Sequence, residues 1–354
     1  MLLEDARQEI NQIDEKMAEL FENRMKAVQQ VISYKMQNNM PVLDWSREQL
    51  VIAKNLAYIK NDSYKPYYED FIKYTMELSK QYQRKLSNSQ TVGFQGTEGA
   101  FSHIALVRIF KQANTKSFAT FEEVFKAVLS GEIACGIIPF ENSFTGEVGE
   151  VFDLLYKYDC HINEIYDLKI NHNLLGAKGA KLSDIKQVYS HHQALSQCGD
   201  FFDKHSYELI PYPNTALASK YISQCNDKSK AAVASSETAE IYSLDVLAKD
   251  INTSAENTTR FIVILKELKT TGNRFNLLFT LEHSTGELAN VMQIIGNYGF
   301  NMESIKSKSL RNVPWQYYFY VELVGDSQSD EAKEMLCKLK ENCKELKLLG
   351  VYAK

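Results

Sequence analysis

The sequence predicts a multidomain chain in three parts: an all-helical part, a two-lobed α/β part and an α+β part. Up to about residue 86 the apolar residues recur every three or four positions, as in helices. From residue 91 short β-rich runs alternate with helical segments, and from residue 274 the order is strand-helix-strand-strand-helix-strand. A chain of 354 residues exceeds a single ordinary core, which also favours several domains.

The composition is that of a globular protein, with 44% hydrophobic and 24% charged residues. The net charge of -5 gives no basic surface for nucleic acid, and no apolar run is long enough to cross a membrane. The first residues, MLLEDARQEI, lack the pattern of a secretory signal. Six cysteines without a CxxC pair indicate buried thiols in a reducing compartment. We therefore expect a cytoplasmic protein without a metal or a cofactor.

The helical part is predicted to contain one long helix to about residue 35, a break at 38–41, two further helices and a linker at 87–90. The long helix carries an apolar stripe that we expect to be buried. The residues of the stripe are Ile10, Ile13, Met17, Leu20 and Val31.

Three cations lie on or near this stripe: Arg24 continues it, Lys35 follows it and Arg7 precedes it. Burying a guanidinium costs several kcal/mol unless an anion meets it. Acids on a facing helix could supply that anion, but three cations on one helix favour a small dicarboxylate held between Arg24 and Lys35, about 16 Å apart along the axis. Arg7 lies about 25 Å from Arg24 along the same helix, so we expect it to enter the site of a second chain in an antiparallel helical dimer.

The second and third helices carry further polar candidates. Asp44, Arg47 and Glu48 share one face at the start of the second helix, although an exposed charge cluster would look the same. Ser79 and Gln83 are four residues apart on the third helix. By themselves they indicate no site, and they become candidates only together with the cations of the first helix.

This set of residues resembles the all-helical chorismate mutase domain over nearly all of residues 1–86. The resemblance implies a rearrangement of chorismate to prephenate, in which the enzyme folds a flexible dianion and stabilises charge on the ether oxygen. It implies that Arg24 and the partner's Arg7 bind the carboxylates, and that Lys35 and Gln83 donate to the ether oxygen. Glu48 and Asp44 would hold the ring hydroxyl or orient Arg47. The matching residues are Arg7, Arg24, Lys35, Asp44, Arg47, Glu48, Ser79 and Gln83.

The α/β part contains two polar stretches next to strands. Residues 139–143, with Glu141, Asn142 and Ser143, follow an apolar strand that ends at Ile138, where side chains commonly face a ligand crevice. Alternatively, these polar side chains only cap the helix that follows. Residues 257–261 place Thr259 at the start of the strand FIVIL, where an ordinary strand-edge threonine is the alternative.

Together with a third stretch, Ser190-His191-His192-Gln193 followed by Gln197-Cys198, these residues resemble the prephenate dehydratase family over about residues 91–268. His192 replaces the proline that is usual in the family. The resemblance implies loss of water and carbon dioxide from prephenate to give phenylpyruvate. It implies that Thr259 donates the proton, that Arg260 anchors a carboxylate, and that other residues contact or orient the substrate. These others are Asn142, Gln197, Glu141, Ser143, Ser190 and Phe261.

The last part has the β-α-β-β-α-β order of the ferredoxin-like arrangement. It resembles the ACT regulatory domain, which in dehydratases of this family binds phenylalanine at an interface between chains. The family's Glu-Ser-Arg-Pro stretch reads Lys306-Ser307-Lys308-Ser309 here, so only the serine is kept. The resemblance implies effector contacts by Gly286, Leu288, Asn301, Met302 and Ser307.

The sequence therefore predicts a bifunctional enzyme of phenylalanine biosynthesis with domains at 1–88, 91–269 and 274–354. Its expected partners are chorismate, prephenate, the effector phenylalanine and a second copy of the chain or more, with no nucleic acid and no membrane. Three alternatives remain open at this point. The first is a mutase whose α/β and ACT parts sense an amino acid without catalysis. The second is a chain that keeps the mutase but has lost the dehydratase activity, and the third is an ACT part that only mediates dimerisation.

Overall fold

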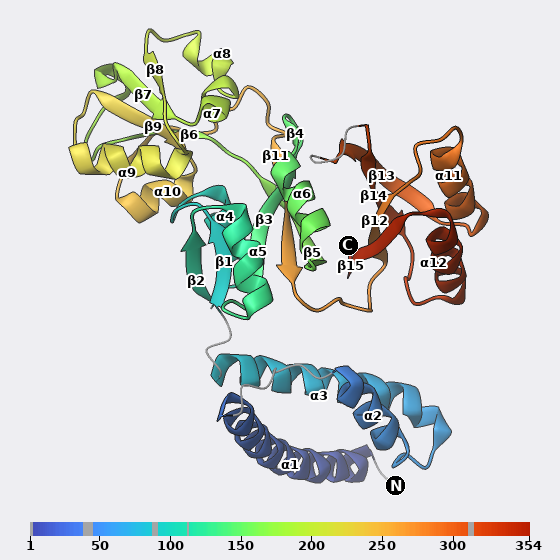
Figure 1. Ribbon diagram of the computed structural model, residues 1–354. Helices are drawn as coiled ribbons and strands as arrows, with labels where there is room; N and C mark the ends of the chain where they lie inside the picture. The colour runs from blue at the N-terminus through green and yellow to red at the C-terminus, as the bar shows by residue number, and fades with distance from the viewer. Residues whose placement is uncertain (1–2, 38–44, 87–90, 112, 311–314) are drawn as a thin grey trace. The chain divides into compact units, whose positions relative to one another are not determined.

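The computed structural model describes residues 3–37, 45–86, 91–111, 113–310 and 315–354, with the backbone alone at 36–37, 45–49, 80–81 and 83–86 (Figure 1). The chain divides into two compact units, Met1–Gln90 and Thr91–Lys354. The three predicted domain ranges remain a prediction. In the second unit the strands of the last range continue the same sheet as those of the preceding one.

The described part of the first unit is helical, as predicted. It contains α1 (Leu3–Gln37), α2 (Trp45–Leu56), the 3₁₀ turn η1 (Asp62–Tyr64) and α3 (Lys65–Leu86). The side chain of Asn61 caps η1 by accepting a hydrogen bond from the Ser63 N–H at 3.1 Å. Pro66 lies in the first turn of α3, where its missing N–H leaves no helical hydrogen bond unmade.

The expected burial of the α1 stripe is wrong for the single chain. Exposed fractions of its apolar residues run from 39% at Val31 to 67% at Leu20, while Ile32 is buried at 2%. The physical reason is that few elements of this unit are available to cover a helix of 35 residues, which is about 52 Å long. Most of the α1 stripe therefore remains open to a further partner.

The second unit begins with a mixed sheet that carries the first lobe. Its strands are β1 (Thr91–Gln95), β2 (Asn114–Phe118), β3 (Cys135–Asn142), β4 (Gly146–Glu147), β5 (His161–Lys169) and β11 (Thr258–Leu265). The helices α4 (Phe101–Ile109), α5 (Phe121–Ser130) and α6 (Gly149–Lys157) pack on it. Strand β11 runs antiparallel to both β3 and β5, and it pairs Thr259 with Asn142.

A second, five-stranded sheet forms the other lobe, in the order β10-β6-β9-β7-β8. The strands are β6 (Asn173–Gly176), β7 (Gln187–Ser190), β8 (Glu208–Pro211), β9 (Lys230–Ala234) and β10 (Asp245–Ala248). Its helices are α7 (His192–Ser196), α8 (Gly199–Phe202), α9 (Thr215–Cys225), α10 (Ser236–Tyr242) and the 3₁₀ turn η2 (Leu182–Asp184).

The chain crosses between the two lobes twice, at residues 170–172 and 249–257. The two crossings are held together by backbone hydrogen bonds from Ile170 N to Asn257 O at 2.7 Å and from Ile251 N to His172 O at 2.8 Å. A separate contact joins the lobes at the turn before α4, where Thr238 Oγ1 donates to Gly99 O at 2.8 Å. The relative position of the lobes is therefore fixed at two places.

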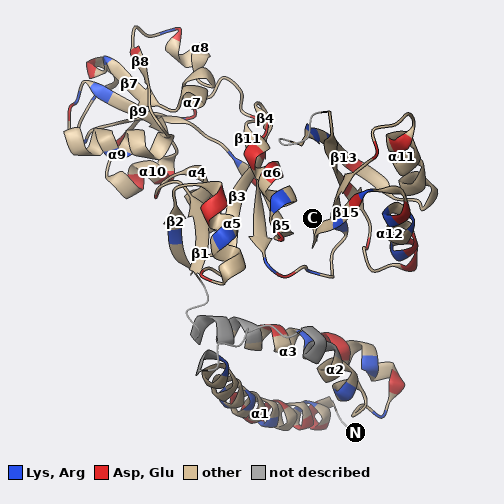
Figure 2. Cartoon of the chain, in the orientation of Figure 1, with Lys and Arg blue, Asp and Glu red and all other residues tan. Residues whose placement is uncertain are grey.

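The last part of the second unit has the predicted β-α-β-β-α-β order. It runs β12 (Arg274–Thr280), α11 (Glu287–Asn297), β13 (Asn301–Ser309), β14 (Tyr317–Val324), α12 (Asp330–Asn342) and β15 (Glu345–Tyr352). Alternate residues of β12 face opposite sides: Phe275, Leu277 and Phe279 pack in one core with α11 and α12, and Leu278 packs in the core around α5 and α6. Charges of both signs cover α12 (Figure 2).

Among the described residues, no helix is long and apolar enough to cross a membrane, and no group of three metal-ligating side chains is present. The expectation of buried thiols holds for Cys135, Cys160 and Cys198 only. Cys225 and Cys337 are exposed because they lie on solvent-facing positions of α9 and α12.

Candidate functional site

In the first unit, Arg24 and Ser79 come together across α1 and α3, as the sequence predicts. The guanidinium of Arg24 is half-buried and donates from Nη1 to Ser79 Oγ and, at 3.4 Å, to the carbonyl of Thr75. Among the described residues, no carboxylate pairs with Arg24. Burial lowers the pKa of Arg24 from its usual value, since water no longer stabilises the full charge. A buried cation in contact with neutral groups is suited to binding an anion.

The other predicted residues of this unit are described only in part. Arg7 is exposed and lies 3.7 Å from Glu4 one turn earlier, whereas Lys35 is half-buried near the other end of α1. Asp44 lies outside the described residues, as do the side chains of Arg47, Glu48 and Gln83.

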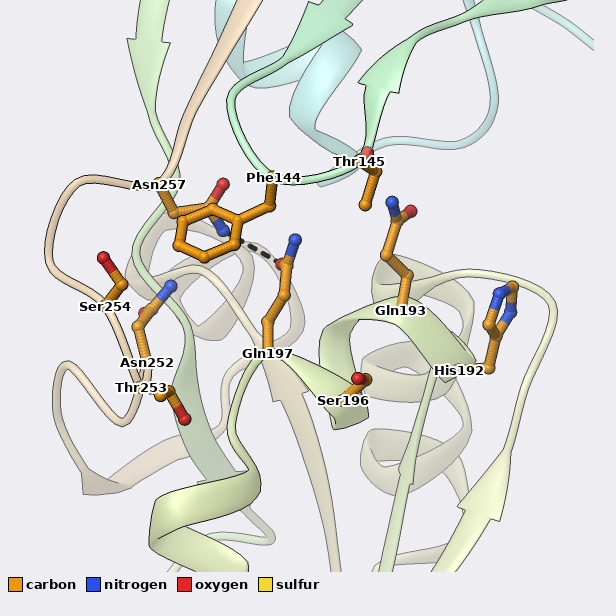
Figure 3. A pocket seen from close by; sticks show the side chains of 10 residues that line it. All are labelled: Phe144, Thr145, His192, Gln193, Ser196, Gln197, Asn252, Thr253, Ser254 and Asn257. Atoms are coloured by element: carbon orange, nitrogen blue, oxygen red, sulfur yellow. Dashed lines mark hydrogen bonds between the residues drawn. The ribbon is translucent and has the colours of Figure 1, made fainter.

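The second unit has a cavity of about 400 Å³ between its lobes (Figure 3). Residues from the β3–β4 turn (144–145), from α7 and its end (192–197) and from the crossing before β11 (252–257) line it. Most of the side chains that line the cavity carry amides or hydroxyls. The other two are Phe144, at the top of the view, and His192, at its right side. The cavity is therefore formed where a substrate would contact both lobes.

Beside the cavity, Asn142 and Thr259 are joined by a hydrogen bond. The Asn142 amide nitrogen donates to Thr259 Oγ1 at 2.9 Å and to Asn257 Oδ1 at 2.8 Å. The Asn142 oxygen accepts from the N–H groups of Phe144 and Thr145, which fixes the orientation of the amide. Asn142 and Thr259 do not themselves line the cavity; they adjoin Asn257, which does.

Gln197 completes a chain of polar contacts from the cavity into the interior. Its side-chain oxygen accepts from Asn257 Nδ2 at 2.9 Å and lies 3.0 Å from His172 Nε2. Burial lowers the pKa of His172, and the hydrogen bond to Gln197 offsets this only partly. The structure thus brings together Asn142, Gln197 and Thr259, three residues that the sequence singles out separately.

Sequence reasoning missed Asn257 and His172. Asn257 stands two residues before Thr259 in the same short run, so its position directly before the strand was an available signal. His172 is a lone histidine between Asn171 and Asn173, and nothing in the sequence connects it with Gln197.

Two predicted substrate residues are corrected by their burial. Ser190 is fully buried and donates to the carbonyl of Val233 at 2.7 Å, and Phe261 is 1% exposed in the core beside α4. Neither side chain faces the cavity, because Ser190 ends a central strand and Phe261 points into the sheet's own core. Ser143 is exposed and holds the β3–β4 turn by accepting from the Thr258 N–H at 3.0 Å.

Arg260 and Glu141 lie side by side on β11 and β3 and contact the last part of the chain. Arg260 lies 3.2 Å from Asp167 and 3.6 Å from Glu322, and Glu141 pairs with Lys306. Burial alone would lower the pKa of Arg260, but the charges of Asp167 and Glu322 outweigh it and raise the pKa. Since successive residues of a strand face opposite sides, Arg260 points away from the Thr259 hydroxyl.

The predicted effector residues are spread over the last part of the chain. Gly286 begins α11 with a φ of +90°, and Leu288 packs partly against the core below this helix. Asn301 and Met302 begin β13 after the 11-residue helix, about 16 Å further along it. Ser307 is exposed on β13. The neighbouring Lys306 and Lys308 face the dehydratase-like part, where Lys308 pairs with Asp153 at 2.9 Å.

Comparison with known proteins gives two family matches. The family described as chorismate mutase type II matches residues 6–84, and the family described as prephenate dehydratase matches residues 92–269. The resemblances predicted for residues 1–86 and about 91–268 are confirmed.

Individual relatives match over almost the whole chain. A bifunctional chorismate mutase/prephenate dehydratase of Buchnera aphidicola from Acyrthosiphon pisum is 31% identical over 98% of this chain and 95% of its own length. The protein of the same description from Escherichia coli K12 is 27% identical with the same coverage. Among solved structures, a prephenate dehydratase from Arthrobacter aurescens in complex with L-Phe is similar, with a TM-score of 0.69 and 25% identity over 75% of this chain and 90% of that one.

Proposed function

Because the chain belongs to the family of bifunctional chorismate mutase/prephenate dehydratases, we propose that its first unit converts chorismate to prephenate and its second unit converts prephenate to phenylpyruvate. The observation that carries this is the match over 98% of the chain to a relative of that description. Both matched families fall on separate stretches, 6–84 and 92–269, so the chain carries both activities of phenylalanine biosynthesis.

In the first unit, we propose that Arg24 binds a carboxylate of chorismate beside Ser79. The support is a half-buried guanidinium whose contacts are a hydroxyl and a carbonyl. Lys35 and Gln83 would donate to the ether oxygen, on which negative charge develops as the bond breaks. Glu48, Asp44 and Arg47 would hold the ring hydroxyl. The rearrangement needs no covalent intermediate, so positioning and charge stabilisation supply the rate.

We propose that this site is shared between two chains. The exposed α1 stripe is long and apolar, and a second α1 running antiparallel would cover it. Arg7 lies too far along α1 to reach a ligand at its own Arg24. Arg7 of the partner subunit would then bind the second carboxylate.

In the second unit, we propose that Thr259 gives its proton to the departing hydroxyl of prephenate. The bond from the ring to the carboxylate breaks and its electron pair enters the ring, which breaks the bond from the ring to the hydroxyl. Carbon dioxide and water leave, phenylpyruvate remains, and the Thr259 oxygen regains a proton from solvent. Asn142 donates to Thr259 Oγ1, which leaves the hydroxyl hydrogen directed elsewhere. Gln197 lines the cavity and would contact the substrate. Arg260 anchors a carboxylate only if its pairs with Asp167 and Glu322 open on binding.

We further propose that residues 274–354 form an ACT domain that binds phenylalanine at an interface between chains. The support is the predicted order of elements and the similarity to a dehydratase solved in complex with L-Phe. Gly286, Leu288, Asn301, Met302 and Ser307 would make the contacts. Isothermal titration should show binding at or below millimolar phenylalanine. No heat under these conditions would leave this part as a dimerisation module only.

One assay tests the two activities together. The purified chain is incubated with chorismate, and the products are followed by their ultraviolet absorbance and by chromatography. Phenylpyruvate is the expected product. Accumulation of prephenate would mean that the second unit senses rather than catalyses, and chorismate that persists would contradict the mutase assignment.

A further inference from the structure

His172 is a buried histidine to which the two reactions assign no part. It is 2% exposed and lies on the first of the two crossings between the lobes. Its backbone N–H donates to Asn252 Oδ1 at 2.6 Å, and its backbone carbonyl accepts from the Ile251 N–H at 2.8 Å. Phe101 packs edge-on against the imidazole at 5.6 Å between ring centres. The backbone of His172 is therefore held by hydrogen bonds, and its ring is held by contact with Phe101.

The direction of the hydrogen bond from His172 follows from its neighbours. Gln197 Oε1 already accepts from Asn257 Nδ2 at 2.9 Å, so the atom facing His172 at 3.0 Å is an acceptor. His172 Nε2 must then carry a hydrogen. His172 Nδ1 is buried and makes no hydrogen bond with the described residues. A charged imidazolium would bury a second, unsatisfied N–H, so the neutral Nε2–H form fits this place.

The same reasoning extends to Thr259. Asn257 uses its nitrogen on Gln197, so its oxygen is the acceptor for Asn142 Nδ2 at 2.8 Å. Asn142 also donates to Thr259 Oγ1 at 2.9 Å, and its own oxygen is occupied by the N–H groups of the β3–β4 turn. Every amide in this chain of contacts has one orientation only. With the Gln197 oxygen turned inward, its amide nitrogen points toward the cavity (Figure 3).

We propose that His172 is a positioning residue of the dehydratase site, which in its neutral Nε2–H form holds Gln197 with its amide nitrogen toward the cavity. The inference rests on the proposed dehydratase function. Its physical basis is that a buried amide takes the orientation its fixed partners demand, because an unmatched donor or acceptor there costs about 1–3 kcal/mol. Without the His172 donor, the Gln197 oxygen keeps only the hydrogen bond from Asn257, so its amide is held less firmly toward the cavity.

The test compares His172→Phe with His172→Gln in the full chain. Phenylalanine keeps a planar ring but offers no donor, so kcat for phenylpyruvate formation should fall roughly tenfold, with a smaller change in KM, because Gln197 then holds the reacting substrate less precisely. Glutamine can donate an amide N–H toward Gln197 and should restore part of that loss. A merely structural role would lower both variants alike, without the difference in kcat.

His161→Phe is the matched control. His161 also has a buried Nδ1 without a hydrogen bond among the described residues, but it begins β5, eleven positions before His172. Its dehydratase kinetics should equal those of the unchanged chain, and the mutase rate in each sample reports whether the protein is intact. Equal activity of His172→Phe and the unchanged chain would overturn the inference. Absence of phenylpyruvate with the unchanged chain would instead overturn the proposed function.

A second measurement is made on the unchanged chain. In protein labelled with ¹⁵N-histidine, the His172 signals are those missing from both His172→Phe and His172→Gln. Resonances of a protonated Nε2 and an unprotonated Nδ1 at neutral pH would support the inference. A protonated Nδ1, in either the other tautomer or the imidazolium, would overturn it.

Discussion

The Thr259 hydroxyl shows how a single contact decides what a residue can do. A threonine hydroxyl is a weak acid in water, and nothing in its sequence position makes it a stronger one. In the folded chain the Asn142 amide donates to Oγ1 at 2.9 Å. This hydrogen bond stabilises negative charge left on the oxygen once the proton has moved to the substrate.

We therefore expect Thr259→Ala to reduce phenylpyruvate formation by roughly 10²–10⁴-fold, the usual contribution of a positioned general acid. Thr259→Ser keeps the hydroxyl and should retain much of the activity. Both are measured from prephenate, with the chorismate-to-prephenate rate of the same sample as control. Equal loss of both activities in Thr259→Ala would point to a folding defect instead.

Buried histidines should make the second unit sensitive to mild acid. The pKa values of His103, His161, His172 and His191 are all lowered, chiefly by burial. The unfolded chain, with histidine pKa values of about 6.5, then binds more protons than the folded chain as the pH falls below that value. Stability is therefore full above about pH 6.5 and declines toward pH 5.5.

Thermal unfolding between pH 7.5 and 5.5 measures this decline, and His172→Phe should reduce its slope. Glu122 does not contribute in this window. Hydrogen bonds from Lys157 and Tyr158 lower its pKa to about 2, so its effect is lost only below its ordinary value of 4.5. A melting temperature that stays constant or rises toward pH 5.5 would contradict the prediction.

At the scale of an element, α1 is unusual in exposing most of its apolar residues. Ile10, Ile13, Met17 and Leu20 are 44–67% exposed, whereas the polar Ser79 on α3 is only 4% exposed. A helix with this distribution places its hydrophobic stripe where a second helix can bury it. Helix α1 is thus fully formed, but its apolar stripe is not buried within a single chain.

Mixing two inactive variants tests the shared site. Arg7→Ala and Arg24→Ala should each lose mutase activity, since each removes one carboxylate contact from every site. Refolded together in equal amounts, half of the dimers are mixed and one of their two sites is intact, so about a quarter of the activity should return. The measurement is chorismate loss, with each variant mixed with itself as control. No recovery in verified mixed dimers would exclude a site shared in this way.

At the scale of the whole second unit, strand β11 and the last part of the chain are joined by ion pairs. Arg260 follows Thr259 directly and meets Glu322 of β14, a carboxylate that is 1% exposed and accepts from Tyr352 at 2.6 Å. One strand over, Glu141 precedes Asn142 and pairs with Lys306 of β13. Thr259 and Asn142 are thus each next in sequence to a residue that forms an ion pair with the last part of the chain.

Glu322→Ala should destabilise the second unit by about 3 kcal/mol, because removing one partner leaves a buried charge uncompensated. The lower end of the usual range applies since Arg260 keeps Asp167. Urea denaturation measures the difference. Glu282→Ala is the control: its pair with Lys344 is 68% exposed on the Glu282 side and should contribute less than about 1 kcal/mol. Equal effects of the two changes would contradict a structural role for the buried pair.

Local signals in the sequence suffice for much of this molecule. The helices of the first unit and the six elements of the last part follow from periodicity and turn residues, whereas the predicted break at 38–41 and linker at 87–90 lie outside the described residues. Thr259, Asn142 and Gln197 were found from short motifs. Ser190 and Phe261 belong to the same motifs, yet they are buried, because neighbours in a strand or loop point in different directions.

The sequence by itself thus determined the order of helices and strands, the family and the motifs to which we assign the chemistry, since each depends on residues close together in the chain. Only the tertiary structure decided that His172, Gln197, Asn257, Asn142 and Thr259 form one chain of hydrogen bonds, and that Arg260 faces Glu322. The physical reason is that hydrogen-bond direction and strand register depend on partners up to 117 positions apart, which no local pattern encodes.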